Sequence, residues 1–176
     1  MFLFPQLNQE AARRGLRFLV IGGHAVIEHG FQRGTEDADI LVSKDHRAEW
    51  LELVTSLGYR LLHDGGTFLQ FEPIEEASWD LDLMLVPRGV FERMLASAQA
   101  ARMEGATVVV PSLEHLLALK VHALKHGRGL RVLKDLTDVA QLIAVNRVGL
   151  QSPWLRAVFE KHGDPEIYER VRKLLS

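Results

Sequence analysis

Two acids in and beside an apolar run constrain the fold of this chain more than any other feature of its sequence. In Asp37-Ala38-Asp39-Ile40, the run ADILV at residues 38–42 predicts a strand, and Asp39 interrupts it. At a rise of about 3.4 Å per residue, Asp37 and Asp39 point to the same face, roughly 7 Å apart at their Cα atoms. Because burying an unpaired carboxylate is expensive, the pair predicts a strand whose acids converge on shared cations.

The rest of the chain predicts a mixed α/β part followed by helices. The run RFLVI at residues 17–21 predicts a buried strand that ends at Gly22-Gly23, and residues 24–29 predict a short helix. Further strands are expected at residues 59–62, 67–72, 79–86 and 106–110, and further helices at residues 6–15, 45–57 and 90–101. From Pro111 almost to the end the pattern is helical, with breaks at Pro153 and Pro165.

The predicted fold class is therefore α/β (α+β), a mixed β-sheet flanked by helices and followed by a C-terminal helical region. We expect residues 1–110 to form the first part and residues 111–176 the second. The two parts should pack together, because each alone would be small and marginally stable. Their seam is then a natural place for a functional site.

Composition excludes several classes of protein. With 21 Lys and Arg against 23 Asp and Glu, the net charge is −2, so no overall positive field draws the chain to nucleic acid. The chain has no cysteine, which excludes disulfides, thiolate metal sites and a cysteine nucleophile. We also expect no signal peptide and no membrane span, and hence a soluble cytoplasmic protein without a membrane partner.

The glycine pair and further acids complete a candidate phosphate and metal site. At a strand-to-helix turn, Gly22 and Gly23 lack a Cβ, so a phosphate can approach the backbone closely. A third carboxylate is available from Asp80 or Asp82, which share a face of the strand predicted at residues 79–86. Three carboxylates beside such a turn can hold two Mg²⁺ or Mn²⁺ ions for phosphoryl transfer.

These residues resemble a known superfamily. An apolar residue, Gly22-Gly23, a gap of 13 residues and Asp37-Ala38-Asp39-Ile40 resemble the signature of the DNA polymerase β-like nucleotidyltransferases. The longer segment VIGGHAVIEHGFQRGTEDADILV is most similar to minimal nucleotidyltransferases and to the toxins of abortive-infection (type IV toxin–antitoxin) systems. The stretch LLALKVHALKHGRGLRVLKDLTDVAQLI resembles the helical motifs of the toxin-like members.

The resemblance implies a nucleotidyltransferase fold and a role for each residue of the first motif. Gly22 and Gly23 would hold the triphosphate, and Asp37 and Asp39 would bind metal. Asp82 would be the third metal ligand and Asp80 its alternative. Many members have serine at the second glycine, so the grip on the triphosphate in this chain would depend more on backbone and cations.

Several cations are candidates for the phosphate side of the site. Arg33 and Thr35 stand in the loop before the acids, where they could touch phosphate or base. Lys120 falls in the middle of an apolar helical stripe, so it either extends along the core to water or reaches a triphosphate. The stripe consists of Leu113, Leu116, Leu117 and Leu124.

The following helix offers Lys134, which the resemblance places with Asp135 on the substrate side. The plainer alternative is a pair of salt bridges on an outward face, Arg131 with Asp135 and Lys134 with Asp138. The packed stripe of that helix would then consist of Leu133, Leu136, Val139, Ala140 and Ile143.

Taken together, these features predict a Mg²⁺-dependent nucleotidyltransferase that moves a nucleoside monophosphate from an NTP to a hydroxyl. The resemblance leaves the acceptor open: an RNA or tRNA 3′ end, a protein or a small molecule. It also allows an antitoxin partner, and specificity could come from a second copy of the chain. The alternative is a weak or inactive NTP-binding module of the same fold; a phosphohydrolase is less favoured, because no nucleophile or base stands beside the acids.

Overall fold

The computed structural model of the chain describes residues 2–75, 78–127 and 129–176, which divide into two compact units. The first comprises Met1–Ala25 and Gly34–Pro111, and the second comprises Val26–Arg33 and Ser112–Ser176. The predicted class is confirmed, because a mixed β-sheet with helices precedes a wholly helical C-terminal part. Residues 26–33 group with these helices rather than with the sheet, so the boundary falls within helix α2 (Gly22–Glu28).

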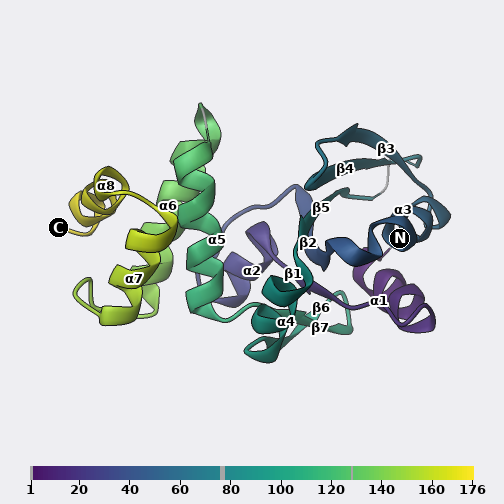
Figure 1. Cartoon of the computed structure of the whole chain (residues 1–176), viewed down its shortest axis with the longest axis horizontal. Helices are drawn as coiled ribbons and strands as arrows, with labels where there is room; N and C mark the ends of the chain where they lie inside the picture. Colours follow the sequence, from purple (N-terminus) through teal and green to yellow (C-terminus); the bar gives the residue numbers. More distant parts are fainter. Residues whose placement is uncertain (1, 76–77, 128) are drawn as a thin grey trace. The chain divides into compact units, whose positions relative to one another are not determined.

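The first unit is built on a five-stranded sheet of order β1-β2-β5-β4-β3 (Figure 1). In chain order its strands are β1 (Phe18–Val20), β2 (Asp37–Ser43), β3 (Tyr59–Asp64), β4 (Phe68–Pro73) and β5 (Asp80–Val86). The central strands β2 and β5 are parallel, and the other neighbouring pairs are antiparallel. Parallel pairing of β2 with β5 brings together the two acid-bearing strands.

Helices α1 (Leu3–Arg13), α3 (Arg47–Ser56) and α4 (Arg88–Ala96) accompany this sheet, with a short 3₁₀ turn, η1 (Lys44–His46), before α3. The fully buried side chains of this unit include Leu41, Trp50, Leu53, Phe71 and Leu83. Along β5, buried Leu81 and Leu83 alternate with the more exposed Asp80 and Asp82, as strand geometry requires. One face of β5 therefore serves the core, and the other carries the acids.

The helix predicted at residues 90–101 is wrong at its C-terminal end. Helix α4 ends at Ala96, and residues 99–101 belong to strand β6 (Gln99–Met103), which pairs antiparallel with β7 (Ala106–Val110). The turn between them is Glu104-Gly105, and both residues have positive φ, 51° and 84°. A two-residue turn of this kind matches the twist of a hairpin, so tertiary pairing overrode the helical composition of the segment.

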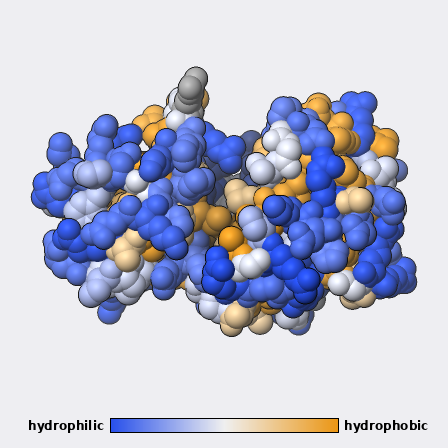
Figure 2. Space-filling view, viewed as in Figure 1, coloured by the Kyte–Doolittle hydropathy of each residue, from blue (hydrophilic) through white to orange (hydrophobic). Residues whose placement is uncertain are grey.

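The second unit contains α5 (Leu113–His126), α6 (Leu130–Val145), α7 (Pro153–His162) and α8 (Pro165–Leu175). Pro153 and Pro165 break the helical run as predicted, and each stands in the first turn of the helix that follows it. Helix α5 packs against α6 and α7, and α6 packs against α8. The surface over α7 and α8 that Figure 2 shows is mostly hydrophilic. Among the described helices, none is long and apolar enough to cross a membrane.

The packed stripe predicted for α6 is wrong in its first turn. Leu133 is 57% exposed, whereas Asp135 and Asp138, predicted on the outward face, are only 4% and 1% exposed. The physical reason is that both acids bind cations from other segments of the second unit, so burial leaves neither carboxylate uncompensated. The rest of the predicted packed stripe is buried, namely Leu136, Val139, Ala140 and Ile143.

Candidate functional site

Three carboxylates from neighbouring strands meet at one place in the first unit. In the parallel register Asp39 lies opposite Asp82, and Asp37 lies opposite Asp80. Carboxylate oxygens of Asp37, Asp39 and Asp82 all lie within 4.8 Å of one another. Asp80 is exposed and is not part of this cluster, which we call the acidic triad.

Gly22 stands directly against the triad. Its φ is +60°, and a Cβ built on it would lie 1.8 Å from Oδ2 and 2.5 Å from Cγ of Asp39. The neighbouring residue Ile21 donates its N–H to the Asp39 carbonyl at 2.9 Å, which extends the pairing of β1 with β2. Gly22 therefore supplies the space that the Asp39 carboxylate occupies, a contact for which sequence reasoning had no signal beyond the glycine itself.

Gly23 follows within α2, which begins two residues before the helix start predicted at His24. Gly23 is buried, whereas Gly22 is partly exposed. Gly22 thus lies beside Asp39 of the triad, and Gly23 is the next residue of α2.

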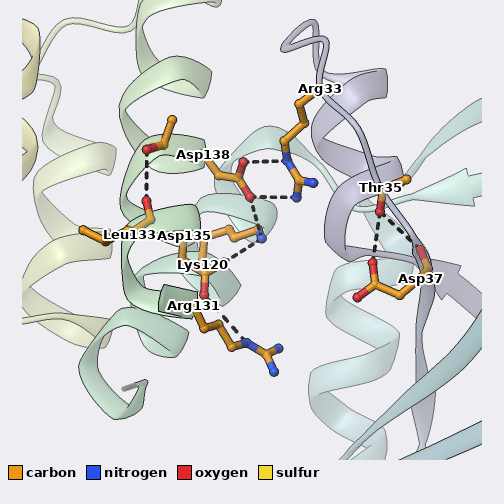
Figure 3. A network of polar contacts seen from close by, with 9 residues as sticks. Arg33, Thr35, Asp37, Lys120, Arg131, Leu133, Asp135 and Asp138 are labelled. Carbon is orange, nitrogen blue, oxygen red and sulfur yellow. Dashed lines mark hydrogen bonds and ion pairs between the residues drawn. The ribbon is translucent and has the colours of Figure 1, made fainter. Parts of the chain in front are cut away.

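Thr35, in the loop that precedes β2, binds the first acid of the triad. Its hydroxyl Oγ1 lies 3.0 Å from Asp37 Oδ1 and 3.3 Å from the Asp37 carbonyl oxygen (Figure 3). A threonine hydroxyl has one hydrogen, so it donates to one of these oxygens at a time. Thr35 therefore contacts a metal-ligand candidate.

Arg33 and Lys120 belong to a separate, buried network in the second unit (Figure 3). The Arg33 guanidinium donates from Nε and a terminal nitrogen to both carboxylate oxygens of Asp138, at 2.8 and 3.0 Å. Lys120 Nζ lies 2.7 Å from Asp135 Oδ1 and 2.8 Å from Asp138 Oδ2. Two cations thus balance two acids, with Arg131 at the rim, 4.0 Å from Asp135.

The two remaining predicted cations, Arg131 and Lys134, differ in their ion pairs. The predicted pair of Arg131 with Asp135 is present, although Asp135 is buried. Lys134 is exposed and takes part in none of the ion pairs found among the described residues, because Asp138 is bound by Arg33 and Lys120. The role of Asp138 was missed: from sequence it was only a helix-surface acid, and Arg33, its partner, is 105 residues away.

The donor set of the triad fits a hard divalent cation. All three side chains offer carboxylate oxygens, which Mg²⁺ and Mn²⁺ prefer, and no thiol or imidazole belongs to the group. Three carboxylates within 4.8 Å repel one another unless a cation lies between them. The arrangement can therefore hold cations against a substrate that carries phosphate groups.

Comparison with known proteins identifies a family for most of the chain. The family model described as "uncharacterised nucleotidyltransferase" matches residues 3–169. No match to the chain is found among curated proteins. Together with the fold, the family match confirms the resemblance to the nucleotidyltransferase superfamily.

Three solved structures with a similar fold illustrate the likeness. The first is an antigenic nucleotidyltransferase-like protein from Paracoccidioides brasiliensis, with 18% identity, 94% of this chain and 88% of that chain covered, and a TM-score of 0.55. The second is ANT(2″)-Ia in complex with adenylyl-2″-tobramycin, with 17% identity, 98% and 96% covered, and a TM-score of 0.61. The third is the lincosamide antibiotic adenylyltransferase LnuA, lincomycin-bound, with 13% identity, 80% and 98% covered, and a TM-score of 0.56.

Proposed function

The chain belongs to the family of uncharacterised nucleotidyltransferases, and from this premise we propose that it transfers a nucleoside monophosphate from an NTP to a hydroxyl acceptor. The acceptor oxygen forms a bond to the α-phosphorus, and the bond from this phosphorus to the oxygen bridging to the β-phosphate breaks. Pyrophosphate leaves, and the hydroxyl proton passes to solvent. The observation that carries the proposal is the acidic triad of Asp37, Asp39 and Asp82.

In this proposal the triad binds Mg²⁺ or Mn²⁺. When bound, the two cations would neutralise the charge of the reacting phosphates and orient the acceptor hydroxyl. Because Gly22 has no Cβ, it leaves room for the Asp39 carboxylate, and Asp82 lies opposite Asp39 on β5. The proposal assigns the third position to Asp82 and not to Asp80, because the exposed Asp80 lies outside the cluster.

The chain offers backbone and cations for the triphosphate. Gly22 and Gly23 are the proposed main-chain contacts for phosphate oxygens. The Asp39 carboxylate already fills the space on the Cβ side of Gly22, so a phosphate would have to approach these residues from another side. Arg33 and Lys120 are the proposed cationic partners; Arg33 pairs with Asp138, and Lys120 pairs with Asp135 and Asp138. The exposed Lys134 is the remaining candidate for phosphate oxygens.

The class of acceptor is the open part of the proposal. Two proteins of similar fold have structures with a small molecule bound, ANT(2″)-Ia with adenylyl-2″-tobramycin and LnuA with lincomycin. Small molecules with free hydroxyls, such as aminoglycosides and lincosamides, therefore belong in any screen, together with RNA 3′ ends and proteins.

Transfer of label from nucleotide to acceptor tests the proposal. The purified chain is incubated with each α-labelled NTP, Mg²⁺ or Mn²⁺, and pools of tRNA, cell lysate or hydroxylated antibiotics. We expect transfer by the wild type and by Asp80→Asn, and its loss in Asp39→Asn and Asp82→Asn. No transfer with any metal, while the NTP still binds, would instead identify a non-catalytic NTP-binding module.

A further inference from the structure

The first residue of the triad is less firmly held by the sheet than the others. Strand β1 pairs only with residues 40–42 of β2, and one further bond joins Ile21 to Asp39. Asp37 is the first residue of β2, and within the sheet it is paired only with β5, opposite the exposed Asp80. The orientation of Asp37 therefore depends on contacts made by the loop that precedes it.

Thr35 provides such a contact. Its hydroxyl reaches both Oδ1 and the carbonyl oxygen of Asp37, at 3.0 and 3.3 Å, from two residues upstream. A bond to Oδ1 fixes the rotation of the carboxylate about its Cβ–Cγ bond and thereby the direction of its second oxygen. Because threonine is branched at Cβ, its own χ1 angle is restricted, so the donor is itself held in place.

We propose that Thr35 is a positioning residue that orients Asp37 for cation binding, and that it acts on the metal rather than on the triphosphate. This inference rests on the proposed function, because it takes the triad to be the cation site. The single hydroxyl hydrogen is already directed at Asp37, so Thr35 has no hydrogen left to donate to a phosphate. This differs from the phosphate or base contact that the position of Thr35 in the sequence suggests.

The proposal predicts a change in metal affinity with the fold intact. Groups that hydrogen-bond to a metal ligand typically change metal affinity by about 10–100-fold when removed. Thr35→Val keeps the shape of the side chain and removes the hydroxyl, so it should weaken Mn²⁺ binding about tenfold. Thr35→Ser keeps the hydroxyl and should bind Mn²⁺ within about twofold of the wild type, since the donor remains.

The test is a Mn²⁺ titration of the full chain without nucleotide, with free Mn²⁺ followed by electron paramagnetic resonance. The matched control is Thr107→Val, an exposed threonine of β7 outside the triad, which should leave the affinity unchanged. Melting temperatures of all three variants should stay close to the wild-type value, which separates positioning from a general structural role. In the transfer assay, Thr35→Val should raise the Mg²⁺ concentration needed for half-maximal rate about tenfold, leave the KM for NTP unchanged and recover kcat at saturating Mg²⁺.

The inference would be overturned by a Mn²⁺ affinity of Thr35→Val within twofold of the wild type, or by an equal loss of affinity in Thr35→Ser. A raised KM for NTP at unchanged Mn²⁺ affinity would return Thr35 to the phosphate side and also overturns it. Failure of the proposed function is seen differently, as absence of label transfer by the wild type, whereas the Mn²⁺ titration does not depend on transfer. A wild-type chain that binds no Mn²⁺ would overturn both.

Discussion

Replacing Gly22 with alanine tests whether the missing Cβ at this position makes room for the Asp39 carboxylate. The added Cβ would lie 1.8 Å from Asp39 Oδ2, 2.5 Å from Cγ and 2.8 Å from Cβ. Unbonded carbon and oxygen atoms approach to about 3.3 Å at closest, so the Asp39 carboxylate must move by more than about 1 Å. A displacement of that size takes Asp39 out of the cluster whose oxygens now lie within 4.8 Å of one another.

Alanine at position 22 also strains the backbone, because φ is +60° there. The left-handed conformation costs a residue with a Cβ about 1–2 kcal/mol. Gly15 offers a matched control, since its φ is +65° and, among the described residues, nothing lies within 4 Å of a Cβ built on it. Gly15→Ala therefore carries the backbone cost alone, and the difference between the two variants isolates the steric effect on Asp39.

We expect Gly15→Ala to lower the free energy of unfolding by about 1–2 kcal/mol and to leave Mn²⁺ affinity unchanged. Gly22→Ala should lose at least as much stability and should also bind Mn²⁺ more than about tenfold more weakly, because a ligand is displaced. Guanidinium unfolding measures the first quantity, and the Mn²⁺ titration measures the second. Equal Mn²⁺ affinity in the two variants would refute the reasoning that Gly22 makes room for Asp39.

Three further perturbations test other parts of the structure. Asp138→Asn removes the charge of a carboxylate that binds Arg33 and Lys120, so the free energy of unfolding should fall by about 3–5 kcal/mol. Arg131→Gln, at the exposed rim of the network, should change it by less than about 1 kcal/mol. Equal losses in the two variants on chemical denaturation would contradict the network. Asp39→Ala should abolish nucleotide transfer yet leave metal-free stability unchanged or higher, because it removes a repelling acid, and a much lower melting temperature without metal would instead mark a structural carboxylate. Burial lowers the pKa of His122 and of His162, and neighbouring histidines and lysines lower it further, so folding disfavours their protonation. The stability that they contribute is present above their ordinary pKa of about 6.5 and should be lost as pH falls through that value, a loss that denaturation at pH 7.5 and 5.5 would detect and that His162→Gln should reduce.

The local parts of the site could be predicted because they depend on periodicity and on turn chemistry. Alternation placed Asp37 and Asp39 on one face of a strand, and the glycine pair marked the place where β1 gives way to α2. Both are properties of a few consecutive residues, so sequence suffices to find them. The hairpin of β6 and β7 escaped prediction because its turn, Glu104-Gly105, is recognised only once its strands pair.

Long-range pairing decided the rest. Asp80 and Asp82 are equivalent by alternation, and only the parallel register of β2 with β5 sets Asp82 beside Asp39. Asp138 stands where an outward helical face was expected, and it is buried because Arg33 reaches it from 105 residues away. By itself, therefore, the sequence determined which residues are candidates for the site and which strands and turns present them. Only the tertiary structure decided which acids meet and which cations they hold, because strand register and charge compensation join segments that local patterns cannot connect.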